Sequence, residues 1–130
     1  PHLTYIACMN NVPARFFVMG SPDGPKNPPP GTVLDAVAPG SDNYSFYLVN
    51  QHVSRGSAAP TQYVVGYDSS TFNVDAIQNL TFKLSHMYYN FPGAVRLPAP
   101  AQYAKKLAHM VATAVHAEVH PRLRETLYYL

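Results

Sequence analysis

The sequence has little charge, one cysteine and no long apolar run, and each shortage narrows the possible class of protein. Charged residues make up 12% of the 130 residues and apolar residues 47%, the balance of a packed globular domain. The lone Cys8 cannot form an internal disulfide, which favours a reducing compartment, cytoplasm or nucleus. Because no run of about 18 apolar residues is present and the start lacks the order of a signal peptide, no transmembrane helix and no membrane partner are expected.

The net charge of +2, from nine Lys and Arg against seven Asp and Glu, is too small to indicate a nucleic-acid partner by itself. The chain has no nucleophile-elbow glycine pattern and no cysteine in a glycine-rich turn, so a self-contained hydrolase is not expected. His109, His116 and His120 would share a face if one helix carried all three, but a zinc site would need an acidic ligand as well. Solvated histidines are the simpler interpretation.

The first half of the chain has the pattern of β-strands. Apolar and aromatic runs at Leu3 to Met9 and Arg15 to Met19, separated by turn residues, predict a β-hairpin. The segment from Ser21 to Gly31 holds five of the thirteen prolines and predicts an irregular loop. Three further strands are predicted, at Thr32 to Val37, Ser45 to Val53 and Thr61 to Tyr67.

The second half has helical periodicity. A first helix is predicted after a plausible N-cap at Asn73 and is ended by Pro92 and Gly93, with its apolar positions at Ile77, Leu80, Thr81, Leu84, Met87 and Tyr88. A second helical pattern runs from about Ala101 to His116. Strands followed by helices indicate an α+β domain in which helices pack on a sheet.

Four segments, in this order and spacing, carry a family resemblance. They are NPPPGTVLD (27–35), SFYLVNQHVSRGSAAPTQYVV (45–65), LTFKLSHMYYNFPGAVRLPAPAQYAKKLAH (80–109) and LYYL (127–130). Together they resemble the PIWI domain of Argonaute proteins, and HMYYN, RLPAPAQYA and LYYL resemble its Piwi clade. The resemblance implies that residues 1–130 are the C-terminal portion of a PIWI domain, an RNase H-like α+β or α/β fold with a mixed β-sheet and packed helices.

The resemblance also bears on catalysis. In the family, two aspartates, a mobile glutamate and a fourth residue hold two magnesium ions that cleave RNA, and the three acidic positions lie upstream of this sequence. The fourth position, usually histidine, is matched by Lys105 in QYAKKLA. Since a protonated lysine has no lone pair for a metal, weak or absent target cleavage (slicing) is expected. Two alternatives stay open: an active RNA-guided endoribonuclease with a neutral Lys105, and a protein-interaction fragment without RNA binding.

The function that the resemblance implies is binding of a small guide RNA (piRNA) in RNA-guided gene silencing. The implied partners are guide and target RNA, silencing cofactors and the rest of an Argonaute chain, in cytoplasm, nucleus or both. The positions that match the guide path are Arg15, Arg55, Tyr88, Arg96, Gln102 and Tyr103. The C-terminal carboxylate of Leu130 matches one that lies beside the guide 5′-phosphate, with Mg²⁺ between them in Piwi-clade members.

Overall fold

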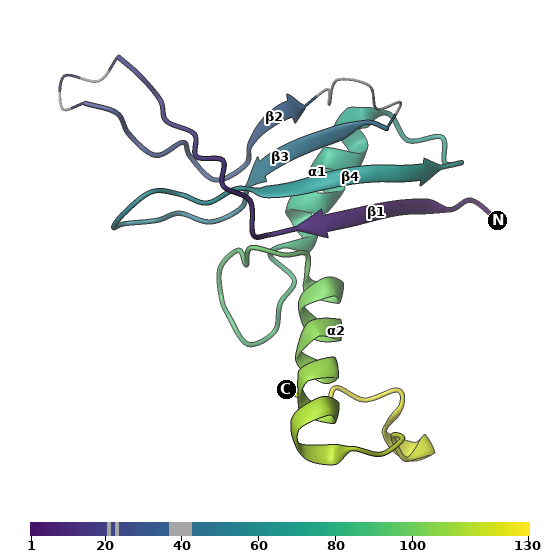
Figure 1. Ribbon diagram of the computed structural model, residues 1–130. Helices are drawn as coiled ribbons and strands as arrows, with labels where there is room; N and C mark the ends of the chain where they lie inside the picture. The colour runs from purple at the N-terminus through teal and green to yellow at the C-terminus, as the bar shows by residue number, and fades with distance from the viewer. Residues whose placement is uncertain (21, 23, 37–42) are drawn as a thin grey trace.

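A four-stranded β-sheet forms the upper part of the molecule in the computed structural model, which describes residues 1–20, 22, 24–36 and 43–130 (Figure 1). Its strands lie in the order β1-β4-β3-β2, and they are β1 (Thr4–Met9), β2 (Thr32–Ala36), β3 (Ser45–Val49) and β4 (Thr61–Asp68). Every pairing among these strands is antiparallel, so the sheet within the described residues is not the mixed sheet that was expected.

The predicted hairpin between Leu3–Met9 and Arg15–Met19 is wrong. Strand β1 forms as expected but pairs with β4, and residues 10–17 form no strand. Val18 makes only an isolated bridge to Lys26 in the proline-rich loop. Of the other predicted strands, β3 ends at Val49 and not at Val53, while Val37 lies outside the described residues.

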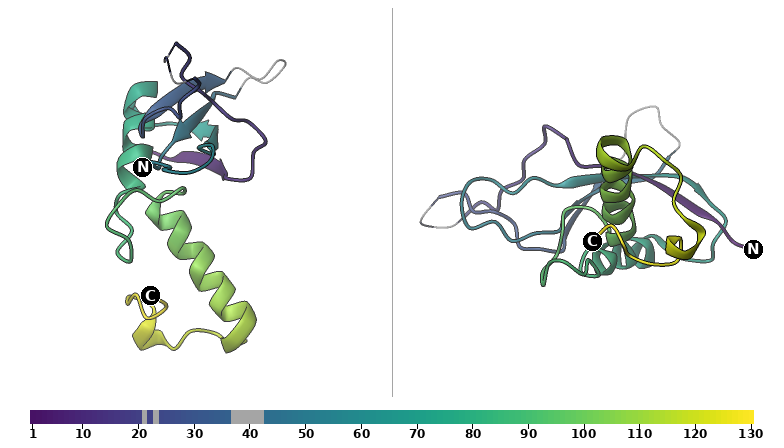
Figure 2. Two further views of the ribbon diagram at one scale, coloured as in Figure 1. Left: turned by 90° about the vertical axis from the view of Figure 1, so that its left-hand side faces the viewer. Right: turned by 90° about the horizontal axis from the view of Figure 1, so that it is seen from below.

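Alternation along the two central strands builds the core. Phe46 and Leu48 of β3 and Tyr63 of β4 are fully buried on one face, and the rings of Phe46 and Tyr63 stack with centroids 5.1 Å apart. Ile77 of helix α1 (Val74–Leu84) is buried against them, so α1 covers this face (Figure 2). Cys8 of β1 packs at the edge of the same cluster, as a small core residue would.

Helix α1 begins after Asn73, as expected, but it ends earlier than expected. The Asn73 side chain accepts a hydrogen bond from the Ala76 backbone N–H at 2.8 Å, the usual role of an N-cap. The helix stops at Leu84 because the buried Ser85 hydroxyl donates to the carbonyl of Phe82 at 2.6 Å, and the Ser85 carbonyl accepts from Val95 N–H at 2.8 Å. Met87 and Tyr88 therefore lie in the loop beyond the helix.

Helix α2 (Ala99–Met110) leads away from the sheet and continues as a π-helical turn, Val111–Val115 (Figures 1 and 2). His116 then adopts a left-handed conformation (φ 50°), which ends the helix and reverses the chain. The C-terminal residues return beside α2 through a 3-10 turn, Pro121–Leu123. No helix in the described part of the chain is both long and apolar enough to cross a membrane.

Candidate nucleic-acid interface

Three arginines are carried by connections around one end of the sheet, where β1 and β3 finish and β2 and β4 begin (Figure 1). Arg15 lies on the connection from β1 to β2, and Arg55 lies on the connection from β3 to β4. Arg96 lies on the loop between α1 and α2, whose backbone is hydrogen-bonded to the same end of β3 and β4. All three side chains are exposed.

No carboxylate among the described residues neutralises the positive charges of these arginines. Arg15 Nη1 donates to the carbonyls of Val12 (3.0 Å) and Ala14 (2.6 Å), and Arg96 Nη2 donates to the carbonyl of Asn10 (2.6 Å). Arg55 has no partner within the described residues. Because a guanidinium has five N–H donors, each of these groups keeps donors for a phosphate.

Buried polar side chains fix the loop that carries Arg96. The Arg96 carbonyl accepts from Asn50 Nδ2 at 2.6 Å and from Thr61 Oγ1 at 2.8 Å, and the Ala94 carbonyl accepts from Gln51 Nε2 at 3.0 Å. Asn50 and Thr61 are 3% and 1% exposed. Asn50, Gln51 and Thr61 could not be identified from the sequence, because polar residues at strand ends are also common in ordinary turns.

The expected guide-path tyrosines lie together. The rings of Tyr88 and Tyr103 are 5.2 Å apart, and Tyr129 near the C-terminus meets Tyr103 edge-on at 6.2 Å. The Tyr103 hydroxyl accepts from Tyr89 N–H (2.8 Å) and donates to the Met87 carbonyl (3.3 Å), so this group holds the loop after α1. Tyr103 is therefore half-buried and structural, whereas Tyr89, which the sequence analysis did not select, is 82% exposed.

Gln102 lies in the first turn of α2, next to Tyr103, and is half-buried. No side chain caps this helix, whose N-cap position is Pro98. Leu130, whose backbone N–H donates to the Leu127 carbonyl at 3.1 Å, is half-buried one residue beyond Tyr129. The tyrosine contacts thus bring the C-terminal end of the chain to the first half of α2.

Lys105 is exposed on α2, whereas the next residue, Lys106, is half-buried. Within residues 1–20, 22, 24–36 and 43–130, no group of three or more His, Cys, Asp or Glu side chains could hold a metal ion. The residues present at Lys105 therefore do not fit a magnesium ion on their own. The three histidines do not share a helix face either, because α2 ends at Met110 and the chain turns at His116.

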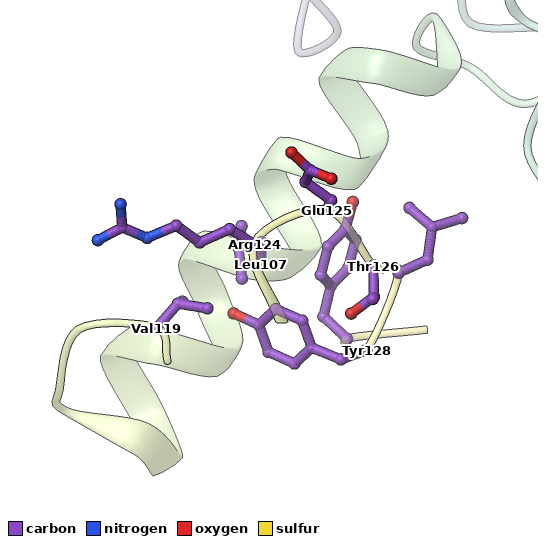
Figure 3. Close-up of a pocket in the computed structure, with 8 residues that line it drawn as sticks. Leu107, Val119, Arg124, Glu125, Thr126 and Tyr128 are labelled. Carbon is purple, nitrogen blue, oxygen red and sulfur yellow. The ribbon is translucent and has the colours of Figure 1, made fainter. Parts of the chain in front are cut away.

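A cavity of about 370 Å³ lies between α2 and the returning C-terminal segment (Figure 3). Leu107 of α2 forms one wall, and Val119, Arg124, Tyr128 and their neighbours form the other. The Tyr128 hydroxyl is buried without a hydrogen-bond partner among the described residues. The C-terminal segment contacts α2 through the edge-on ring pair Tyr103 and Tyr129, and within the segment the rings of Tyr128 and Tyr129 also meet edge-on, at 5.4 Å.

A further clamp that the sequence did not reveal joins the loop of Arg55 to the proline-rich loop. Asn27 Nδ2 donates to the carbonyl of Gly56 at 2.8 Å, while Asn27 Oδ1 accepts from Ala58 N–H at 2.8 Å. Gly56 has φ +77°, a conformation that glycine adopts readily. The only sequence signal was Asn27 itself, at the start of the run NPPPG.

The chain matches the Piwi domain family over residues 1–116. It is 48% identical over 130 residues to Piwi-like protein 1 of Gallus gallus and 43% identical to Protein piwi of Drosophila melanogaster, covering 100% of this chain and 15% of each relative. The crystal structure of Drosophila Piwi superposes with a TM-score of 0.89 at 43% identity, covering 100% of this chain and 18% of that chain. A Kluyveromyces polysporus Argonaute with a guide RNA has a TM-score of 0.80 at 21% identity, covering 100% and 19%, which supports the fold alone.

The fold is therefore the RNase H-like PIWI fold, as expected from the resemblance. The chain belongs to the Piwi domain family, and its similarity is to the Piwi clade of Argonautes. It spans about 15% of the length of these curated relatives.

Proposed function

We propose that this chain is the C-terminal part of the PIWI domain of an Argonaute that binds a small guide RNA for gene silencing. The observation that carries the proposal is the set of three arginines, Arg15, Arg55 and Arg96, around one end of the sheet, none with a carboxylate partner among the described residues. Phosphate contacts supply most of the affinity of such interfaces, and unpaired guanidinium groups are suited to them. The partners are guide and target RNA, silencing cofactors and the remainder of the Argonaute, in cytoplasm, nucleus or both.

The tyrosines add a second part to this surface. Tyr88 packs on Tyr103, and Tyr103 holds the backbone of Met87 and Tyr89, so Tyr88 and Gln102 are presented from a fixed loop and helix start. Side chains on a fixed backbone lose less conformational entropy when they bind an RNA backbone. In this proposal Tyr88 and Gln102 contact the guide, and Tyr103 acts chiefly by positioning.

The Leu130 carboxylate is proposed to lie at the guide 5′-phosphate with Mg²⁺. A single carboxylate fits this ion, because Mg²⁺ in proteins is commonly held by one or two carboxylates together with substrate phosphates and water. The ion would supply charge neutralisation between two anions. The contribution of this chain is to hold the C-terminus beside α2 through Tyr129 and Tyr103.

Slicing is proposed to be weak or absent. Lys105 stands exposed on α2 and, when protonated, offers no lone pair to a metal. An active slicer is the first alternative and would require a neutral Lys105. A protein-interaction domain without RNA binding is the second, and it is disfavoured by three exposed arginines that have no carboxylate partner among the described residues.

The test is purification of the full-length natural protein that contains these residues, followed by sequencing of bound small RNA and measurement of guide affinity at several salt concentrations. Single Arg15→Ala, Arg55→Ala and Arg96→Ala variants should each weaken guide binding and lower the salt slope by about 1. Lys83→Ala, which removes an exposed cation in the last turn of α1 outside this set, is the matched control. Absence of bound RNA, with affinity unaffected by all three substitutions, would leave only the protein-interaction alternative.

A further inference from the structure

We infer that Asn50 and Thr61 are positioning residues that set the place of Arg96 on the RNA-binding surface. Neither residue contacts solvent appreciably, so neither can bind RNA directly. Both donate a hydrogen bond to the Arg96 carbonyl, at 2.6 Å and 2.8 Å, from the ends of two adjacent strands. The RNA readout of this inference rests on the proposed function, whereas its structural readout does not.

The loop that carries Arg96 needs such support, because it contains no helix or strand of its own. Residues 85–98 include Pro92 and Gly93 and join the end of α1 to the start of α2 (Figure 1). Between residues 94 and 97 every position is nevertheless held. Ala94 accepts from Gln51, Val95 donates to the Ser85 carbonyl, Arg96 accepts from Asn50 and Thr61, and Leu97 is 8% exposed.

The geometry of Asn50 indicates that its amide donor is what this position uses. Its Nδ2 group donates both to the Arg96 carbonyl and to the Tyr63 hydroxyl (3.1 Å), whereas its Oδ1 is buried without a partner among the described residues. An unpaired buried oxygen lowers the stability of the folded state, because it loses its hydrogen bonds to water. An apolar side chain would avoid that cost, so the hydrogen bond to Arg96 accounts for the presence of an amide in the core.

With its backbone fixed in this way, the Arg96 side chain can reach across to β1. Its Nη2 donates to the Asn10 carbonyl at 2.6 Å, just after that strand ends, and its remaining N–H groups are open to a phosphate. Arg96 thus has a fixed backbone, a fixed side-chain direction and no carboxylate partner in the described part of the chain. Loss of the backbone bonds would let the guanidinium move away from its binding position.

The experiment compares Thr61→Val, which removes the hydroxyl at nearly constant shape, with Thr61→Ser, which keeps it, in the full-length natural protein. Thr61→Val should weaken guide binding about three- to tenfold and lower the salt slope by up to 1, as expected for loss of one phosphate contact. Thr61→Ser should keep most of the native guide affinity and most of the native salt slope. Combining Thr61→Val with Arg96→Ala should weaken binding no more than Arg96→Ala alone.

Two further measurements separate positioning from general stability. Tyr63→Phe removes another hydrogen bond of Asn50 but leaves those of Arg96, so it should lower stability without changing the salt slope. Hydrogen exchange, measured without RNA, should show loss of protection at Val95 N–H in Thr61→Val and in Asn50→Leu.

Each contrary result has a definite meaning. Unchanged protection at Val95 in Asn50→Leu would overturn the inference whatever the RNA results. If Arg96→Ala weakens guide binding but Thr61→Val does not, the inference fails and the proposed function stands. If Arg96→Ala has no effect while Arg15→Ala and Arg55→Ala do, Arg96 is not a contact and its positioning by Thr61 is overturned. If no arginine substitution has an effect, the proposed function fails as well.

Discussion

Asn27 and Ala58 are joined by a hydrogen bond of 2.8 Å from the Ala58 N–H to the Asn27 side-chain oxygen, across two loops 31 residues apart in sequence. The Asn27 amide nitrogen returns a bond to the Gly56 carbonyl, so the side chain closes the loop that carries Arg55. A freely moving arginine would lose side-chain and backbone entropy on meeting RNA. In the proposed function, this pair of Asn27 hydrogen bonds would reduce the entropy that the Arg55 loop loses on binding RNA.

Asn27→Ala should therefore lower stability by about 1–2 kcal/mol, since it leaves Ala58 N–H and Gly56 C=O without their partners. Guide affinity should fall in the same direction as in Arg55→Ala, but by less. Asn27→Asp is the matched variant for stability, because it keeps the acceptor for Ala58 and loses the donor to Gly56; the negative charge that it adds near Arg55 excludes it from the guide titration. Chemical denaturation and guide titration measure the two effects, and an Asn27→Ala protein with native stability would contradict the role of the clamp.

Local sequence patterns predicted the positions of most helices and strands, but they did not predict which strands pair. Helix α1 could be predicted because Asn73 caps it and Ile77 sets its buried face, both properties of neighbouring residues. The hairpin prediction was wrong because β1 pairs with β4, more than fifty residues away in the sequence. An apolar run shows that a strand is present but not which strand it pairs with. The end of α1 was misplaced since it depends on Ser85 and its bond to Val95.

The candidate site shows the same difference between local properties and contacts of distant segments. Arg15, Arg55 and Arg96 were selected through the resemblance alone, and the structure adds that all three are exposed, while their role in binding RNA stays a prediction. The residues that hold them, Asn27, Asn50 and Thr61, act through backbone carbonyls and amides of distant segments. Those contacts exist only after the sheet has formed, so no spacing in the sequence could indicate them.

The exposed Lys105 leads to a catalytic prediction. In the full-length natural protein loaded with a 5′-phosphorylated guide, Lys105→His should increase magnesium-dependent cleavage of a matched target by roughly 10- to 100-fold, because a neutral imidazole can ligate a metal. Lys106→His is the control for a histidine at the neighbouring position. Native cleavage as fast as that of Lys105→His would mean that Lys105 is neutral or stands away from the metals.

The hydroxyl of Tyr103 can be tested apart from its ring. Tyr103→Phe keeps the contact with Tyr88 but leaves Tyr89 N–H without its 2.8 Å partner, so the loop after α1 should loosen. We expect a loss of about 1 kcal/mol in stability and faster hydrogen exchange at Tyr89. Tyr129→Phe, which alters another ring of the same cluster, should leave exchange at Tyr89 unchanged. Equal exchange in all three proteins would show that this hydroxyl does not hold the loop.

The buried Tyr63 predicts a loss of stability in alkali. Burial raises the pKa of Tyr63 to about 12 from the ordinary value of 10.0, so the folded state holds the proton more tightly than the unfolded state. The contribution is therefore complete below pH 10 and is lost as the pH rises through about 12, with a total of at most about 2–3 kcal/mol. Denaturation at several pH values should show this decline in the native protein and a weaker one in Tyr63→Phe. An identical decline in both would assign it to other groups.

No described helix covers the face of the sheet opposite α1 (Figure 2), and the strand register places Tyr5, Tyr67 and Leu34 on this face. Tyr5 is 61% exposed, Tyr67 56% and Leu34 40%. Exposed apolar surface beside the unpaired edges of β1 and β2 favours association between copies, so residues 1–130 alone should aggregate with rising concentration. Tyr67→Lys and Leu34→Lys should reduce light scattering, whereas Leu123→Lys, in the C-terminal 3-10 turn, should not. If the isolated chain stays monomeric at every concentration and melts cooperatively, this face is not a source of aggregation.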